Sequence, residues 1–470
     1  MMRKITLLFL LVVCSVVVAA RQAKYVFYFI GDGMGVNQVQ GAELFKGELE
    51  GRIGLAPLLF TQFPVATVAT TYSATNGVTD SAAAGTALAT GKKTKNGAIG
   101  VLADLQTPVN SVAVWAQNQG CRVGIATSVS VDHATPAAFY AHEAGRSSYY
   151  AIGKDLYAAG FDFYAGSDFL EPEDKTGEND DLYEMAEKNG YVIARGYQDY
   201  QLKSKQADKM ILFQSEVASK ADRTAVPYAI DRTDSDLSLS EITRAAVDFL
   251  SKDLSKGFFL MVEGGKIDWA CHSNDAATAF REVADLDDAV KIAYDFYTRY
   301  PDETLIVVTA DHETGGLALG TGAYALNLQV LQNQKVSENG LTRRINELRR
   351  QTGNQVSWEA AQKVLSETFG FWQTVKLSDK QEDRLKEVYE KSFKNQNVSM
   401  EKSEYSQDEP IAAEAKRIMD EIAMVGWTSG GHSAGYVPVF AVGAGSGLFS
   451  GRLDNTQIPV KIAQAAGYVH

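Results

Sequence analysis

A chain of 470 residues is long enough for one large α/β domain with insertions, or for two domains. Hydrophobic residues make up 45% and charged residues 22% of it, which argues against an extensively disordered protein. The formal net charge of −13 would repel a phosphate-rich polymer, so we do not expect nucleic acid as a partner, and three cysteines exclude a disulfide scaffold.

Residues 1–20 have the pattern of a secretory signal peptide. Arg3 and Lys4 precede an apolar run over residues 5–20, which ends in small side chains. The run is shorter than the about 20 residues that a membrane span requires. We therefore expect cleavage near Ala20 and a secreted or periplasmic protein, with an uncleaved anchor as the alternative. We do not expect lipidation at Cys14 or a stable membrane anchor.

After this segment, short apolar runs alternate with helical patterns, which is typical of βαβ units around a mostly parallel sheet. The predicted strands are 25–30, 122–127, 258–262, 304–309 and 437–442. The predicted helices are 36–45, 112–119, 240–254, 274–297 and a C-terminal helix from about residue 460. The fold class is therefore expected to be α/β.

Two regions depart from the alternation. Residues 162–232 are polar, and we expect a looser excursion with short strands. Residues 323–424 are also polar and carry three amphipathic helical patterns, at 357–369, 379–393 and 411–424, with a loop over 395–407. Because this second region lies between two strand-like segments, we interpret it as an insertion that projects from the sheet. It is expected to shape substrate access or a subunit contact.

Acidic and histidine side chains lie next to several predicted strands. They are Asp32 after strand 25–30, Glu263, Asp268 and His272 at the end of strand 258–262, Asp311 and His312 after strand 304–309, and His432 before strand 437–442. Ligands gather at the carboxyl ends of the strands in open parallel sheets, so we expect these side chains to converge. Histidine nitrogen and carboxylate oxygen are zinc ligands. Taken singly, each has a structural alternative, such as a helix cap for Asp32.

Two further groups carry chemistry suited to phosphate. Asp80 and Ser81 precede a run of small residues that predicts a helix, whose N-terminus would favour an anion beside the Ser81 hydroxyl. A plain helix cap is the alternative. Beyond strand 122–127, Thr135 offers an oxygen to magnesium, and Arg146 could pair with a phosphoryl or carboxylate group through two hydrogen bonds. Alternatively, Thr135 begins a helix and Arg146 is a solvated charge.

From about residue 25 to the C-terminus, these segments resemble the alkaline phosphatase family and occur in the family's order. They are residues 31–35, 79–85, 133–136 with Arg146, 263–268 with His272, 311–316, and His432. The resemblance implies a three-layer α/β/α sandwich around a large, mostly parallel sheet, and a homodimer. It also implies hydrolysis of phosphate monoesters through a phosphoserine at Ser81, with two Zn²⁺ and one Mg²⁺ per subunit.

The resemblance further implies a role for each site residue. The first zinc would be held by Asp268, His272 and His432, the second by Asp32, Asp311, His312 and the Ser81 oxygen, and the magnesium by Asp32, Thr135 and Glu263. Arg146 would grip two phosphoryl oxygens, and Asp80 would orient its guanidinium. His133 and Trp269 would lie beside the magnesium. A histidine there should bind magnesium through water more weakly than an aspartate, so we expect activity that depends on added magnesium and has an alkaline optimum.

Other functions compete with this one. The chain could be a phosphodiesterase, sulfatase or phosphonate hydrolase of the same superfamily, a non-catalytic phosphate- or metal-binding protein, or an interaction protein that works through residues 323–424. Arg146 favours a monoester because its fork needs two free equatorial oxygens, and Ser81 beside a full ligand set argues against a purely binding role. The sequence leaves the physiological substrate, the metal of the third site and any pairing of Cys121 with Cys271 open.

Overall fold

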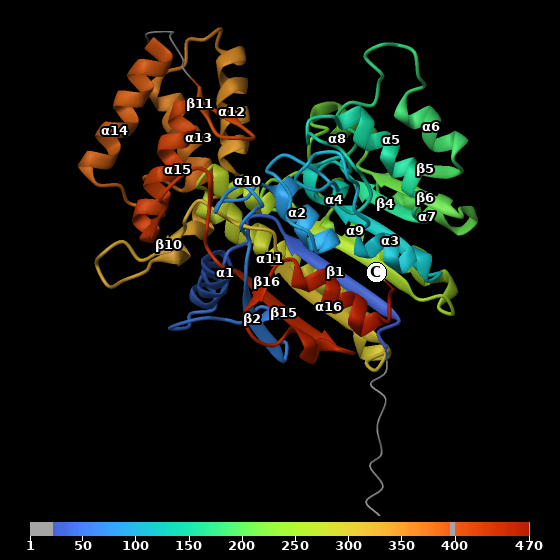
Figure 1. Ribbon diagram of the computed structural model, residues 1–470. Helices are drawn as coiled ribbons and strands as arrows, with labels where there is room; N and C mark the ends of the chain where they lie inside the picture. Colours follow the sequence, from blue (N-terminus) through green and yellow to red (C-terminus); the bar gives the residue numbers. More distant parts are fainter. Residues whose placement is uncertain (1–21, 395–399, 470) are drawn as a thin grey trace, which may run out of the picture.

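Strand β1 (Tyr25–Gly31) is buried at every residue, which requires cover on both of its faces. On one face the ring of Phe27 lies 5.6 Å from that of Phe296, between centroids, and on the other the ring of Tyr28 lies 6.0 Å from that of Phe139. In this computed structural model, the sheet is therefore the middle layer between two layers of helices (Figure 1). The predicted α/β architecture is confirmed.

The structure describes residues 22–394 and 400–469. The predicted signal peptide and its cleavage near Ala20, part of the predicted loop (residues 395–399), and His470 lie outside these residues.

Ten strands form the main sheet. Their spatial order is β16 (Leu453–Asp454), β2 (Val65–Thr70), β15 (Val437–Gly443), β8 (Thr304–Ala310), β1, β7 (Phe258–Gly264), β3 (Arg122–Thr127), β4 (Phe163–Gly166), β6 (Lys209–Phe213) and β5 (Tyr191–Arg195). Every pair from β8 to β5 is parallel, whereas β15 runs antiparallel to both of its neighbours. The sheet is thus mostly parallel, as predicted.

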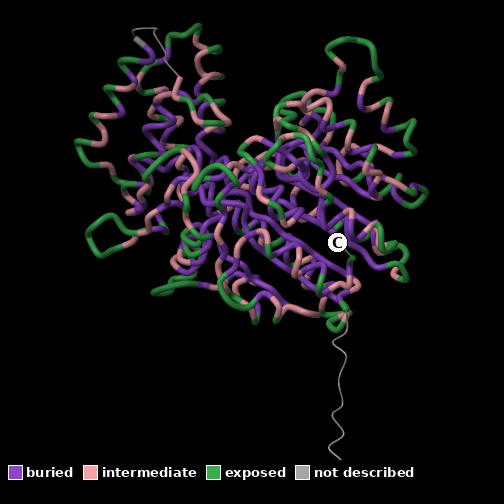
Figure 2. The backbone as a smooth tube through the Cα atoms, in the orientation of Figure 1, coloured by how far each residue is buried: buried purple, intermediate pink, exposed green. Residues whose placement is uncertain are grey.

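Helices cover both faces of the sheet. On one face lie α9 (Leu239–Leu250) and α11 (Ala276–Arg299), with α1 (Val36–Leu49) and α10 (Lys266–His272) packed against α11. On the other lie α2 (Ser81–Thr90), α3 (Val112–Asn118), α4 (Ala134–Ala137) and α16 (Gln457–Ala466). Figure 2 shows that the buried residues are concentrated in the sheet and where these helices contact it.

Residues 162–232 contain the short strands that were expected, but they do not form a loose excursion. This region supplies β4, β5 and β6, which extend the main sheet to its edge, and the helices α5 (Tyr149–Ala159), α6 (Leu182–Lys188), α7 (Tyr197–Lys203) and α8 (Glu216–Ala221) flank it. The three strands have only four or five residues each. Strands this short, separated by polar connections, carry too little hydrophobic pattern for their bounds and their place in the main sheet to be predicted.

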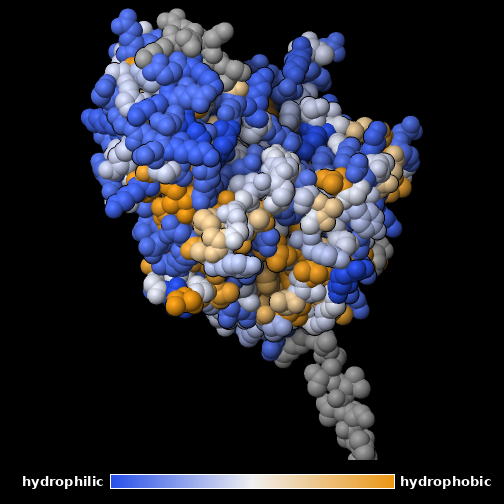
Figure 3. All heavy atoms as spheres, turned by 90° about the vertical axis from the view of Figure 1, so that its left-hand side faces the viewer, coloured by the Kyte–Doolittle hydropathy of each residue, from blue (hydrophilic) through white to orange (hydrophobic). Residues whose placement is uncertain are grey.

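The described residues of 323–394 and 400–424 form four α-helices rather than the three predicted. They are α12 (Glu338–Gln351), α13 (Trp358–Phe369), α14 (Asp379–Tyr389) and α15 (Pro410–Ala423), which pack together as a lobe at the upper left of Figure 1. Helix α12 escaped prediction because Leu341 and Ile345 are its fully buried apolar side chains in an otherwise polar sequence. Figure 3 shows the outward surface of the lobe as mostly hydrophilic.

The lobe is closed at its base by a short antiparallel pair. Strand β10 (Ala318–Leu319) pairs with β13 (Val425–Gly426), so the chain leaves and re-enters the sandwich at one point. The predicted loop over 395–407 also contains structure, because β11 (Glu401–Lys402) and β12 (Gln407–Asp408) form a hairpin. This hairpin extends from the lobe toward the carboxyl ends of the central strands.

Candidate metal centre

The register of the central strands brings the first acidic residues together. Gly31 of β1 lies opposite Ala310 of β8, so the residues that follow them, Asp32 and Asp311, emerge from the sheet side by side. On the other side of β1, Glu263 of β7 lies opposite Ile30. Because parallel strands end at a common edge, side chains far apart in the sequence form one site there.

The glycine-rich turn after β1 allows a close approach. Gly33 has a φ of 71°, and a Cβ at this position would lie 2.8 Å from the Cα of Asp268. Its N–H donates a 3.1 Å hydrogen bond to Asp311 Oδ1. A side chain at Gly33 would therefore collide with Asp268.

A first cluster contains Asp268, His272 and His432. Asp268 and His272 lie one turn apart on α10, and His272 Nε2 is 3.3 Å from Asp268 Oδ2. His432 arrives from β14 (His432–Ser433), which pairs with β9 (Glu313–Thr314), and its Nε2 is 3.1 Å from that of His272. The ligand atoms of the three residues lie within 4.8 Å of one another. Nitrogen and carboxylate donors at such distances suit a metal ion.

A second cluster joins Asp32, Asp311 and His312 to the Ser81 hydroxyl. His312 Nε2 is 3.3 Å from Asp32 Oδ1, 3.3 Å from Asp311 Oδ2 and 3.2 Å from Ser81 Oγ. Ser81 is the first residue of α2 and is fully buried. Its oxygen therefore lies at a helix N-terminus, beside three possible metal ligands.

A third cluster contains Asp32, His133 and Glu263, so Asp32 belongs to two clusters. Thr135 is fully buried on α4, and its Oγ1 has no hydrogen-bond partner among the described residues. The ring of Trp269 lies 6.0 Å from that of His133. The structure thus places His133 within this cluster and Trp269 beside it.

The histidine rings are oriented by atoms outside the clusters. His272 Nδ1 lies 2.6 Å from the Gly430 carbonyl oxygen, and His432 Nδ1 lies 2.8 Å from that of Thr79. A ring that donates from Nδ1 to a carbonyl keeps its Nε2 lone pair for a metal. These carbonyl partners leave no signal in the sequence, because any residue type supplies a backbone oxygen.

The carboxylates of the centre are buried without enough hydrogen bonds. Burial, followed by the charges of Asp311 and Asp268, raises the pKa of Asp32 well above its usual value, and burial raises that of Glu263 to about 7. Within the described residues, Asp32 Oδ1 and Oδ2, Glu263 Oε1 and Asp311 Oδ2 have no hydrogen-bond partner. Buried acidic oxygens are normally paired or bound to cations, so the residues present fit metal ions.

We expect the buried carboxylates of the centre to destabilise the metal-free protein as the pH rises. The pKa of Glu263 is raised from 4.5 to about 7 in the folded protein, so the folded state holds a proton that the unfolded state releases. The raised pKa values of Asp32 and Asp311 act in the same direction. The contribution of these carboxylates to the free energy of unfolding should therefore fall between about pH 4.5 and pH 7 and stay low above pH 7, whereas the lowered pKa values of His133 and His312 act in the opposite direction.

Melting temperatures of chelated and metal-loaded protein, measured across this range, test the expectation. Glu282 and Glu338 also have raised pKa values, about 8 for each, but they lie outside the clusters and act in both forms. The gap between the two melting temperatures should therefore widen from acidic to alkaline pH. A constant or narrowing gap would show that metal ions do not neutralise these carboxylates.

Arg146 lies beside α2, the helix that begins with Ser81, and adds a positive charge to the site. Its Nη1 is 3.3 Å from Asp80 Oδ2, and its Nη2 is 3.4 Å from His133 Nε2. Asp80 also caps α2 by accepting from the Ala83 N–H at 3.0 Å, so the cap and the arginine contact coexist. Burial opposes the charge of Arg146, but Tyr405, Asp80 and Asp32 raise its pKa, and the guanidinium remains a cation.

Two residues that the sequence analysis missed reach the centre from the lobe. Tyr405 Oη lies 3.3 Å from Arg146 Nη2, and Glu404 Oε2 lies 3.5 Å from His272 Nε2. Both occupy the tip of the β11–β12 hairpin, which was expected to be part of a loop. An isolated tyrosine in a polar stretch carries no sequence signal for such a contact.

The two cysteines and His142, which were also considered from the sequence, take no part in the three clusters. Cys121 and Cys271 are both free thiols. His142 contacts the Gly100 carbonyl oxygen at 2.7 Å and belongs to none of the three clusters. Within residues 22–394 and 400–469, none of the helices has the length and apolar character needed to cross a membrane.

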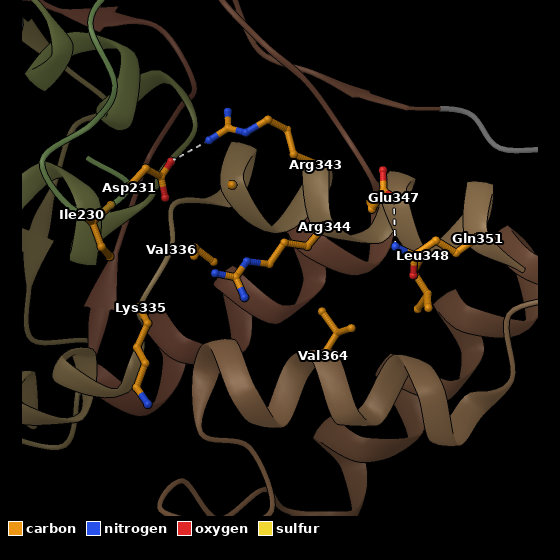
Figure 4. Close-up of a pocket in the computed structure, with 11 residues that line it drawn as sticks. Ile230, Asp231, Lys335, Val336, Arg343, Arg344, Glu347, Leu348, Gln351 and Val364 are labelled. Atoms are coloured by element: carbon orange, nitrogen blue, oxygen red, sulfur yellow. Dashed lines mark hydrogen bonds and ion pairs between the residues drawn. The ribbon is translucent and has the colours of Figure 1, made fainter. Parts of the chain in front are cut away.

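A pocket in the lobe is separate from this centre. It has a volume of about 590 Å³ and lies between α12, α13 and residues 230–231 (Figure 4). The residues that line it include Asp231, Lys335, Arg343 and Arg344, and none belongs to the three clusters. The metal centre, and not this pocket, is therefore the candidate site, because it contains the buried polar groups described above.

A family model described as alkaline phosphatase matches residues 23–160 and 162–468. Alkaline phosphatase 3 of Bacillus subtilis is 32% identical over 453 residues, which cover 95% of this chain and 90% of the relative. The tissue-nonspecific alkaline phosphatase of Gallus gallus is 33% identical over 334 residues, covering 62% of this chain and 63% of the relative.

Solved structures give the same result. A cold-active alkaline phosphatase from the psychrophile Shewanella sp. superposes with a TM-score of 0.77 at 29% identity, covering 94% of this chain and 99% of that chain. The alkaline phosphatase of Thermus thermophilus gives a TM-score of 0.77 at 26% identity, covering 96% and 92%. A mutant of the TAB5 alkaline phosphatase, described with Mg bound in its M3 site, gives 0.65 at 26% identity, covering 96% and 100%.

Proposed function

The chain belongs to the alkaline phosphatase family and is a metal-dependent phosphoric monoester hydrolase; from this premise we propose that it works through a phosphoserine at Ser81. The observation that carries the proposal is the position of Ser81 Oγ, 3.2 Å from His312 Nε2 at the N-terminus of α2. A hydroxyl beside a ligand cluster and a helix N-terminus is placed to become a nucleophile.

We assign the metal ions to the three clusters. Two zinc ions would be held by Asp268, His272 and His432, and by Asp32, Asp311 and His312, because nitrogen and carboxylate donors suit zinc. A magnesium ion would be held by Asp32, Thr135 and Glu263, with His133 beside it, because oxygen donors suit a hard cation. When bound, such ions stabilise negative charge on the entering and leaving oxygens as Lewis acids.

The protein's own groups account for the remaining steps. The Ser81 hydroxyl gives up its proton and its Oγ forms a bond to phosphorus, while the bond from phosphorus to the leaving oxygen breaks and that oxygen takes up a proton to leave as the alcohol. Water then attacks the phosphoserine, the bond between Oγ and phosphorus breaks, and the Ser81 hydroxyl and inorganic phosphate are released. Arg146 donates to two nonbridging oxygens, and the free N–H groups at the start of α2 add further donors. Asp80 keeps the guanidinium in place from the side that faces α2.

This arrangement favours monoesters over the competing substrate classes. A diester carries two nonbridging oxygens on phosphorus and a monoester carries three, so with a diester no third oxygen remains for other donors once Arg146 has bound two. A grip directed mainly at the phosphoryl group also leaves the alcohol unspecified, and we propose a broad range of monoesters. The apolar run over residues 5–20 supports export, and the family resemblance supports a homodimer.

Turnover of a chromogenic phosphate monoester at alkaline pH tests the proposal. We expect activity that disappears on chelation, returns in part with zinc alone and returns fully with zinc and magnesium together. A chromogenic phosphodiester and a sulfate ester, assayed in parallel, should turn over far more slowly. Absence of monoester turnover in protein with measured bound zinc would contradict the proposal, and faster diester or sulfate turnover would replace it.

A further inference from the structure

The tip of the β11–β12 hairpin is held rigidly by its own hydrogen bonds. The Ser403 N–H donates to the Ser406 carbonyl oxygen at 3.1 Å, and the hydroxyl oxygens of these serines lie 2.8 Å apart. Glu404 and Tyr405 are therefore the two central residues of a closed turn. The hairpin is tied to the lobe by an ion pair between Glu401 and Arg417. The turn presents its side chains at a set position.

Tyr405 occupies a gap between the lobe and the metal centre. Its ring stacks on Trp269, with centroids 4.6 Å apart and planes at 10°. The edges of His133 and His272 contact the same ring, at centroid distances of 6.0 Å and 5.3 Å. An aromatic ring fixed on several sides cannot rotate away, so its hydroxyl stays beside Arg146.

Both terminal nitrogens of the Arg146 guanidinium thereby contact a protein oxygen. Asp80 Oδ2 lies 3.3 Å from Nη1, and Tyr405 Oη lies 3.3 Å from Nη2. Because an arginine only donates, the Tyr405 oxygen accepts this hydrogen bond. A guanidinium that is already oriented before phosphate binds loses less conformational freedom on binding. Its two hydrogen bonds to phosphate then contribute more to the affinity.

We propose that Tyr405 is a positioning residue, which holds Arg146 at the orientation that grips the phosphoryl group and so couples the lobe to catalysis. The inference rests on the proposed function and deepens it, since it gives the lobe a role within the subunit's own site. Tyr405 acts through Arg146, and the stack on Trp269 keeps it there.

Binding of inorganic phosphate to the metal-loaded protein, measured by calorimetry, tests this role. Tyr405→Phe keeps the ring stack and removes only the hydroxyl, and we expect the dissociation constant to rise by about three- to tenfold. Tyr405→Ala removes both and should have a larger effect. Lys402→Ala, an exposed change on the same hairpin, is the matched control and should bind phosphate as the unaltered protein does. Measured metal content should be unchanged in all three.

A double-mutant cycle with Arg146→Ala separates positioning from a general structural role. If Tyr405 acts through Arg146, Tyr405→Phe should change phosphate binding little once Arg146 is absent. Unchanged phosphate binding in Tyr405→Phe alone would overturn the proposal, and so would an undiminished effect in the Arg146→Ala background. Failure of the unaltered protein to hydrolyse monoesters would instead contradict the proposed function, and the two results are distinguishable.

Discussion

Replacing Ser81 with alanine should lower monoester turnover by about three to six orders of magnitude, the range seen when a hydrolase loses its nucleophile. The Ser81 side chain is fully buried, and its oxygen lies 3.2 Å from His312 Nε2. The variant keeps Asp32, Asp311 and His312, so it should retain its metal ions and fold. Loss of turnover would then reflect loss of the attacking oxygen.

Trapping of the covalent intermediate makes this test specific. Brief incubation with labelled phosphate followed by acid quenching should label the unaltered protein on a peptide that contains Ser81, and should not label Ser81→Ala. Ser446→Ala, at the opposite end of β15, is a matched serine control and should behave as the unaltered protein does. Label on Ser81→Ala, or turnover within tenfold of normal, would exclude Ser81 as the nucleophile.

Asp32→Asn is expected to empty two metal sites with one substitution. Asp32 contributes to two clusters, one with Asp311 and His312 and one with His133 and Glu263. Loss of a group that only hydrogen-bonds to a metal ligand costs about 10- to 100-fold in metal affinity, and loss of a direct ligand shared by two ions should cost more. The protein should therefore retain metal mainly at the first cluster, that of Asp268, His272 and His432, and turnover should be undetectable.

Metal content per chain, measured after dialysis, checks this prediction. Asp268→Asn is the comparison, because Asp268 belongs to a single cluster and its replacement should deplete only one metal. Asp295→Asn, an exposed position on α11, should leave metal content and turnover unchanged. Equal metal loss in Asp32→Asn and Asp268→Asn would show that Asp32 does not bridge two ions.

Much of the fold follows from local sequence pattern. Long, continuous apolar runs predicted β1, β7 and β8 to within two residues at their ends, because strands buried on both faces contain few polar side chains. The strands β4, β5 and β6 were expected only as short strands of an excursion, and their place in the main sheet was not predicted because each is short. Helix α12 was missed because its apolar stripe is narrow.

The sequence by itself determined the residue types of the centre and their order along the chain. Asp32, Glu263 and Asp311 each lie at the end of a predicted strand, and a parallel sheet brings such ends to one edge. Asp268 and His272 are four residues apart, which one helical turn converts into neighbours. These relations are local in the sequence, so the strand and helix periodicities are enough to predict them.

Only the tertiary structure decided how the clusters are divided and what supports them. The strand register places Asp32 against Asp311, and the carbonyl oxygens of Thr79 and Gly430 orient two histidines. Tyr405 contacts Arg146 across 259 residues of chain. Such contacts depend on the packing of distant elements, and neither a backbone carbonyl nor a single tyrosine in a polar stretch has a pattern that a sequence can display.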